Sequence, residues 1–234
     1  MKLFYLFFIF LFCSCSNNKP VDNEKVKRSY SIASEQKTIK WDSLIAKKIT
    51  YTDLSYLNIF EVNFKRMTNI DDCHDSCVVS VKIIDKKSKN LVDTLEITSA
   101  YFFDDVFCNN NRARSYITEK NFKMQAVDNN YGDLIIADLN FDEKEDIAVI
   151  NDSGGNGGPF YSYYIQGVDN KFHLDKFLTD SMIFFPSKII PKKSMLITYV
   201  HAGACGVSEN KFKFDKSTKQ WERAGRKIIG SCGY

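Results

Sequence analysis

Short apolar segments separated by polar turns dominate the chain from residue 57 onward. These segments are four to eight residues long and rich in β-branched and aromatic residues, and several alternate apolar with polar positions, which indicates β-strands. The segments on either side of residues 85–90 predict a β-hairpin. A second hairpin is predicted over Lys211–Ile229, turning at Asp215–Lys219. The other predicted strands and the arms of the first hairpin are Leu57–Phe64, Val78–Ile84, Leu91–Ile97, Phe122–Val127, Leu134–Ala137, Ile147–Ile150, Phe160–Ile165 and Met195–His201.

This pattern predicts an all-β domain, either a single antiparallel β-sandwich or a partly closed barrel. The 19 Phe and 12 Tyr residues fit this prediction, because aromatic side chains suit a half-buried pleated surface. One segment favours a helix instead. Trp41, Leu44, Ile45 and Lys48 share one helical face, so Trp41–Ile49 is predicted as a short amphipathic helix.

The first 40 residues are expected to lie outside the β-domain. Residues 3–12 form an apolar segment after Met1-Lys2, too short to span a bilayer, and residues 17–40 are polar and charged. The start resembles a bacterial lipoprotein signal, with Cys15 as the lipidated residue and Cys13 as a poorer acceptor. The alternative is a cleaved signal that leaves a soluble secreted protein. We therefore divide the chain into a lipoprotein signal peptide (1–14), a flexible tether (15–40) and a β-sandwich domain (41–234).

The location expected from this division is the bacterial cell envelope, with the protein anchored to a membrane by lipid and facing the periplasm or the surface. The charge balance adds that nucleic acid is not an expected partner. The chain has 32 basic and 29 acidic residues, a net charge of +3, and no nucleic-acid-binding motif.

An acidic segment between two of the apolar runs is the strongest candidate for chemistry. Asp138, Asn140, Asp142 and Asp146 follow the pattern D-x-N-x-D-x-x-x-D, and the backbone carbonyl of Lys144 can add another oxygen. Calcium prefers six to eight oxygen ligands, so the segment predicts a calcium loop. Glu143 stands where such loops usually carry Gly. The alternative is a solvated turn rich in Asp and Asn.

A glycine-rich segment follows the next apolar run. Residues 151–161 read NDSGGNGGPFY, and four glycines between two predicted strands allow close approach of the backbone to a partner. The alternative is a connection without a partner.

Cysteine chemistry gives weaker signals. Export makes Cys73, Cys77, Cys108, Cys205 and Cys232 disulfide candidates, an odd number. The preferred bridge joins Cys205 to Cys232, and a second joins Cys73 or Cys77 to Cys108. Zinc at Cys73, His74 and Cys77 lacks further ligands. The best candidates for a nucleophile and its base are Cys205 and His201, respectively. A disulfide at Cys205 removes the nucleophile, so no enzyme activity is expected.

The lipoprotein start, the D-x-N-F-D strand end, Asp146 and the Ser153-Gly154 loop together resemble the calcium-binding bacterial immunity lipoproteins, which are related to periplasmic inhibitors of I-type lysozyme. The resemblance covers residues 128–234. It implies an antiparallel β-sandwich that obstructs the cleft of a lysozyme-like or other peptidoglycan hydrolase. Ser153 and Gly154 match the start of the inhibitory loop, and Phe160 and Tyr161 are the nearest aromatic residues. The alternative function is a calcium-stiffened envelope binding or structural module without inhibition.

Overall fold

A computed structural model describes residues 41–69, 74–99, 112–122, 131–152 and 154–230. Residues 39–234 form one compact unit, and the predicted signal peptide and tether lie outside the described residues, as does most of the predicted strand Phe122–Val127. No helix in the described ranges is long and apolar enough to cross a membrane.

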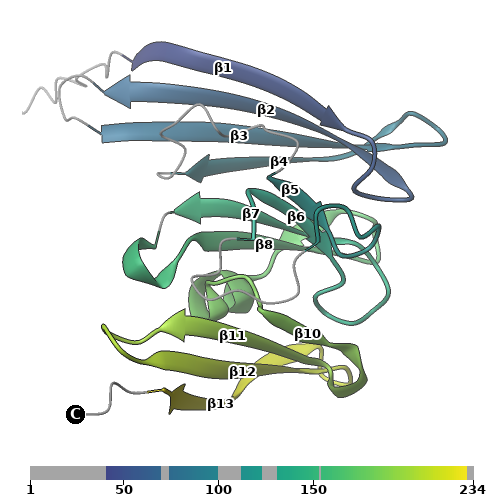
Figure 1. Ribbon diagram of the computed structural model, residues 1–234. Helices are drawn as coiled ribbons and strands as arrows, with labels where there is room; N and C mark the ends of the chain where they lie inside the picture. The colour runs from purple at the N-terminus through teal and green to yellow at the C-terminus, as the bar shows by residue number, and fades with distance from the viewer. Residues whose placement is uncertain (1–40, 70–73, 100–111, 123–130, 153, 231–234) are drawn as a thin grey trace, which may run out of the picture. The chain divides into compact units, whose positions relative to one another are not determined.

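The described chain is all-β and consists of three open sheets with neighbouring strands in chain order (Figure 1). The first sheet contains β1 (Trp41–Tyr51), β2 (Asn58–Asn69), β3 (His74–Asp85) and β4 (Leu91–Ser99). The second contains β5 (Ala113–Ser115), β6 (Leu134–Ala137), β7 (Asp146–Asp152), β8 (Phe160–Gln166) and β9 (Phe172–Leu174). The third contains β10 (Lys188–Ile190), β11 (Met195–His201), β12 (Val207–Asp215) and β13 (Gln220–Ile229).

Three short helical turns complete the described elements. They are the 3₁₀ turns η1 (Gly155–Gly157) and η3 (Pro191–Lys193) and the π-helical turn η2 (Leu178–Met182). All described strand pairs are antiparallel except β5 with β6. The predicted all-β fold is therefore confirmed in a sandwich-like form, and the barrel alternative is not adopted.

Burial along the strands explains how the sheets are layered. In β2 the alternate residues Phe60, Val62 and Phe64 are buried, as expected of a sheet with one covered face. In contrast, all four residues of β6 and the first five of β7 are buried. The middle sheet is therefore covered on both faces, and Figure 1 shows it between the other two.

The predicted helix Trp41–Ile49 is wrong, because this segment forms β1. Its second half pairs with β2 in antiparallel register, with Ile49 opposite Val62 and Tyr51 opposite Phe60. Residues 46–51 alternate between exposed and more buried positions, so the segment also has a period of two. Pairing with β2 outweighed the helical spacing of the apolar residues, which lies in the first half of the strand.

Candidate functional site

The acidic loop between β6 and β7 is closed by hydrogen bonds from its own backbone to its carboxylates. The two Asp138 carboxylate oxygens accept the N–H groups of Asp142 (3.1 Å) and Glu143 (3.0 Å). The Asn140 side-chain oxygen also accepts the Asp142 N–H, and Asp142 in turn accepts the Lys144 N–H, each at 3.1 Å. The loop shape is thus set by the same side chains that were predicted as calcium ligands.

Two residues of this loop have left-handed backbone conformations. The φ angles are 63° at Phe141 and 66° at Glu143. Glu143 therefore occupies the backbone geometry for which a calcium loop usually uses Gly, at a cost of about 1–2 kcal/mol. The hydrogen bond from its N–H to Asp138 helps to offset this cost.

Asp146 lies at the base of the loop and is completely buried. One carboxylate oxygen accepts the N–H groups of Leu139 (2.8 Å) and Asn140 (3.3 Å), and the other accepts the N–H of Gln166 (3.0 Å). Burial raises the pKa of Asp146 to about 8, against the opposing effect of these three donors. Burial also raises the pKa of Asp138, again opposed by backbone donors.

This geometry alters the predicted calcium site. Among the described residues no group of three or more His, Cys, Asp and Glu side chains is placed to hold a metal ion. Asp146 faces the interior of the protein, where its carboxylate accepts three backbone N–H groups. The residues that fit calcium are Asp138, Asn140 and Asp142, whose oxygens keep lone pairs beyond the hydrogen bonds above. Lys144 contributes its N–H to the turn and its ammonium to the carbonyl of Gly167 (2.9 Å).

Glu145 has a structural role that the sequence pattern did not predict. Its buried carboxylate accepts the hydroxyl of Ser55 (2.5 and 2.6 Å) and the side-chain amide of Asn58 (3.1 Å). It therefore joins the acidic loop to the turn between β1 and β2, about 90 residues earlier in the chain. The only sign of this contact in the sequence is the high density of acidic residues around position 145.

A groove of about 710 Å³ runs beside the acidic loop. Phe141, Asp142 and Lys144 line one side, and the turns after β8 and β12 line the rest. His173 lies here, with its imidazole 3.1 Å from both carboxylate oxygens of Asp169. Charged side chains of both signs line the groove together with apolar side chains.

The described part of the glycine-rich loop between β7 and β8 has a shape that depends on glycine. Gly154 has φ 62°, and its N–H donates to the Asp152 carboxylate at 3.1 Å. A Cβ at Gly154 would lie 1.9 Å from the Gly158 carbonyl oxygen, so only glycine fits. Gly155 has φ 59° but faces open space. The loop protrudes beyond the ends of the strands (Figure 1).

The four residues predicted to contact a partner have different environments. Ser153 lies outside the described residues. Gly154 shapes the loop, and Phe160 is partly exposed, with its ring edge-on to Phe184 at 5.3 Å. Tyr161 is completely buried, and its hydroxyl donates to the Gly132 carbonyl at 2.8 Å. Tyr161 therefore cannot be the surface anchor expected from the sequence, because the alternation of β8 turns it into the core.

Two of the cysteines predicted to form disulfides, Cys77 and Cys205, lie among the described residues. Cys205 is disulfide-bonded, so it is not a nucleophile beside His201. Cys77 is a buried thiol on β3, and a bridge from Cys77 to Cys108 is not formed. Cys73, Cys108, Cys232 and the predicted lipidation site Cys15 lie outside the described residues, so their chemistry stays a prediction.

Comparison with known proteins adds little to this geometry. No protein-family model matches the chain, and no curated protein matches it. A solved structure with some similarity is that of a Xanthomonas type IV secretion system related protein, which is 18% identical and matches with a TM-score of 0.42. The match covers 81% of this chain and 87% of that chain. A similarity at this TM-score carries no argument about function.

Proposed function

We propose that the protein is an envelope lipoprotein that inhibits a peptidoglycan-cleaving, lysozyme-like hydrolase with its glycine-rich loop. The observation that carries this proposal is the shape of the loop at residues 154–158. It protrudes from two strands whose flanking residues, Ile150 and Tyr161, are completely buried. Steric crowding at Gly154 limits the conformations open to the loop, and a loop with fewer conformations loses less entropy on binding.

The loop tip has the form needed to enter a cleft. A Cβ added at Gly155 would meet no other atom within 4 Å, so the backbone here can come close to a partner. Phe160 and Phe184 form an aromatic pair at the base of the loop. Aromatic side chains are common energetic centres of interfaces, and Phe160 takes the anchor role first assigned to Tyr161.

Calcium, where it binds, adds a positive charge among the oxygens of Asp138, Asn140 and Asp142. These residues lie in the loop that leads into β7, and the glycine-rich loop begins at the other end of the same strand. An ordered start of β7 helps to hold the position of the loop. Anchoring through Cys15 and the tether of residues 15–40 belong to the same proposal.

The test is inhibition of purified peptidoglycan hydrolases of several classes by the intact protein. Gly155→Lys places a long side chain on the loop tip, and we expect it to weaken inhibition at least 10-fold. The chain already holds Lys89 (φ 61°) and Lys219 (φ 55°) in this backbone region, so the variant is expected to fold.

The matched control is Asn170→Lys. Asn170 is exposed with φ 60° in the turn after β8, at the opposite end of that strand from the glycine-rich loop. It adds the same side chain in the same backbone conformation and should leave inhibition unchanged. If no hydrolase is inhibited, the inhibitory role is wrong. If both variants inhibit as well as the wild type, the glycine-rich loop is not the inhibitory element. Calcium-dependent stability without inhibition would favour the binding or structural module instead.

A further inference from the structure

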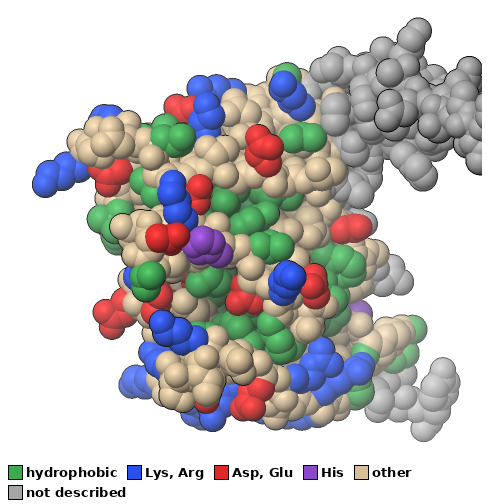
Figure 2. Space-filling view, turned by 180° about the vertical axis from the view of Figure 1, so that it is seen from behind, with side chains coloured by type: hydrophobic (Ala, Val, Ile, Leu, Met, Phe, Trp, Pro, Cys, Tyr) green, Lys and Arg blue, Asp and Glu red, His purple; other side chains and the backbone are tan. Residues whose placement is uncertain are grey.

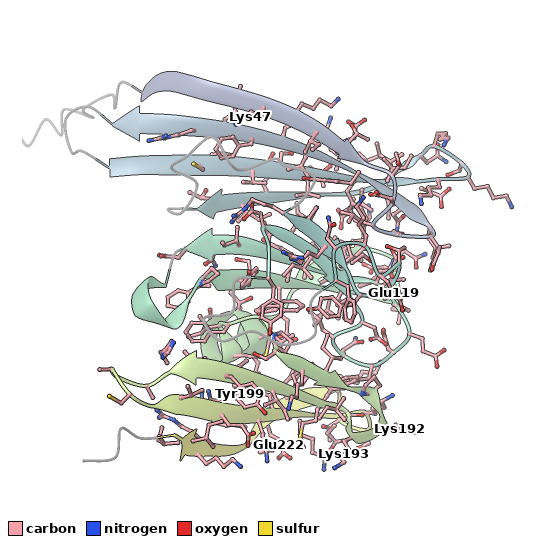
Figure 3. All side chains as sticks on the ribbon, in the orientation of Figure 1. Lys47, Glu119, Lys192, Lys193, Tyr199 and Glu222 are labelled. Carbon is pink, nitrogen blue, oxygen red and sulfur yellow. The ribbon has the colours of Figure 1, made fainter. Side chains whose placement is uncertain are left out.

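The segment that forms the third sheet has a net positive charge, whereas the rest of the chain is net negative. Residues 186–230 contain ten Lys and Arg against three Asp and Glu, which leaves 22 against 26 in the rest of the chain. Figure 2 shows Lys and Arg side chains gathered over the lower part of the molecule, where Figure 1 places β10–β13. On the outer side of this sheet, Lys192 and Lys193 lie near Glu222 (Figure 3). An anionic partner is therefore expected to meet this sheet.

One pocket at this sheet is lined by basic residues and contains no acidic residue. It has a volume of about 230 Å³ and lies between residues 181–184, at the end of η2 and just after it, the end of β11 and the central parts of β12 and β13. Arg223, Arg226 and His201 line it, together with the polar side chains of Ser208 and Asn210. The volume suits a single small anionic group rather than a large ligand.

Hydrogen bonds and a ring contact hold the two arginines in place. The Arg226 Nε donates to the Ser208 hydroxyl at 3.1 Å, and Ser208 donates to the Asn210 side-chain oxygen at 3.2 Å. The Arg223 side chain donates to the Ser181 carbonyl at 3.1 Å, and its guanidinium carbon lies 5.6 Å from the centre of the Phe212 ring. Each guanidinium has five N–H donors, so both keep donors for a ligand.

The pocket shares a wall with the glycine-rich loop. A Cβ at Gly157 would lie 3.0 Å from the Phe184 ring and 3.3 Å from a Val200 methyl group. Phe184 and Val200 both line the arginine pocket. The pocket and the glycine-rich loop are therefore adjacent at Phe184 and Val200.

We propose that this pocket binds a carboxylate side chain of the same hydrolase whose cleft the loop enters; this inference rests on the proposed function. Glycoside hydrolase clefts carry a pair of Asp or Glu residues. An arginine guanidinium recognises a carboxylate through two parallel hydrogen bonds, which gives direction as well as charge attraction. The loop supplies shape, and Arg223 and Arg226 supply the charge complement.

The first test uses sodium acetate as the probe on the intact protein. In a chemical-shift titration at constant ionic strength, we expect saturable shifts at Arg226 Nε–H and Ser208, and the shift at Ser208 should vanish in Arg226→Gln. Sodium phosphate serves as the second arm. Shifts with phosphate but not with acetate overturn the carboxylate assignment, and no saturable shift with either probe overturns the pocket itself.

The second test measures affinity for an inhibited hydrolase. Arg226→Gln and Arg223→Gln are each expected to raise Kd at least 10-fold, and Arg226→Lys should restore only part of the loss because lysine lacks the two-pronged donor. Lys213→Gln removes the same charge from the outer side of the same sheet, as a control, and should change Kd less than 3-fold. If the arginine variants bind like this control while Gly155→Lys still blocks inhibition, the pocket assignment is wrong and the loop function stands.

Discussion

The two loops on either side of β7 are ordered by different physical means. The acidic loop before β7 is closed by its own side chains, because the carboxylates of Asp138 and Asp142 accept backbone N–H groups within five residues. The glycine-rich loop after β7 is ordered by the absence of side chains, since a Cβ at Gly154 or Gly157 would crowd neighbouring atoms. Under the proposed function, the oxygens of the acidic loop serve a cation and the exposed backbone at Gly155 serves a protein partner.

The difference predicts opposite sensitivities to mutation. The acidic loop should fail when an acceptor is removed, and the glycine-rich loop should fail when an atom is added. The two largest effects test the two sides of this contrast by the free energy of unfolding, measured by chemical denaturation.

The largest effect is expected at the base of the acidic loop. Asp146→Ala removes the acceptor for the N–H groups of Leu139, Asn140 and Gln166 in a fully buried position. A buried donor left without a partner costs about 1–3 kcal/mol. Because the loop can relax in part, we expect the free energy of unfolding to fall by about 3–5 kcal/mol. Asp138→Ala is the control, because its half-exposed donors can turn to water, and about 1 kcal/mol is expected. Equal losses for both variants would contradict the burial argument.

The next effect separates two neighbouring glycines. Gly154→Ala brings a methyl group against the Gly158 carbonyl oxygen and the Phe160 ring, and about 3 kcal/mol should be lost. Gly155→Ala has nearly the same φ but open space, so only the left-handed penalty of about 1 kcal/mol remains. If the two variants lose the same stability, steric crowding does not order this loop.

The contrast between the loops also explains how much could be predicted from the sequence. β6, β7, β8 and both hairpins were predicted well, because their apolar runs and polar turns are local signals. The turn around Asp138 was predicted from an equally local signal, the spacing of Asp and Asn residues. In contrast, Phe184 and Val200 lie about 30 to 45 residues beyond the glycine-rich loop, and nothing near the loop in sequence marks them as its neighbours.

The environments of two predicted site residues, Asp146 and Tyr161, differ from those expected, because the burial of a side chain depends on the whole fold. Asp146 follows the spacing of a ligand, but it begins a strand of the doubly covered middle sheet and is therefore buried. Tyr161 is adjacent to Phe160 in a strand, so only one of the two can face outward. The arginine pocket was not predicted, because its walls come from four separate segments between residues 181 and 226.

A smaller effect tests the role of Tyr161. Tyr161→Phe leaves the Gly132 carbonyl without the hydroxyl that donates to it inside the core, and about 1–2 kcal/mol should be lost. Hydrolase inhibition should not change, because the ring has no exposed surface. Phe160→Ala is the comparison, since this ring is partly exposed beside the loop and its removal should weaken inhibition. A loss of inhibition in Tyr161→Phe at unchanged stability would return Tyr161 to the interface.

The smallest effect concerns calcium at the acidic loop. With Asp146 committed to backbone donors, Asp138, Asn140 and Asp142 supply too few protein oxygens for a tight site, and a Kd of about 10⁻³ M is expected, at the weak end of extracellular sites. At 10 mM calcium, mass action then stabilises the folded state by about 1.4 kcal/mol. Calorimetry with calcium and with chelator measures this as a rise in Tm. Asp142→Asn keeps the hydrogen bond that Asp142 accepts from the Lys144 N–H but removes a negative charge, so it should lose the calcium response while keeping the Tm measured in chelator. A Tm that calcium leaves unchanged in the wild type would show that the carboxylates serve only to close the turn.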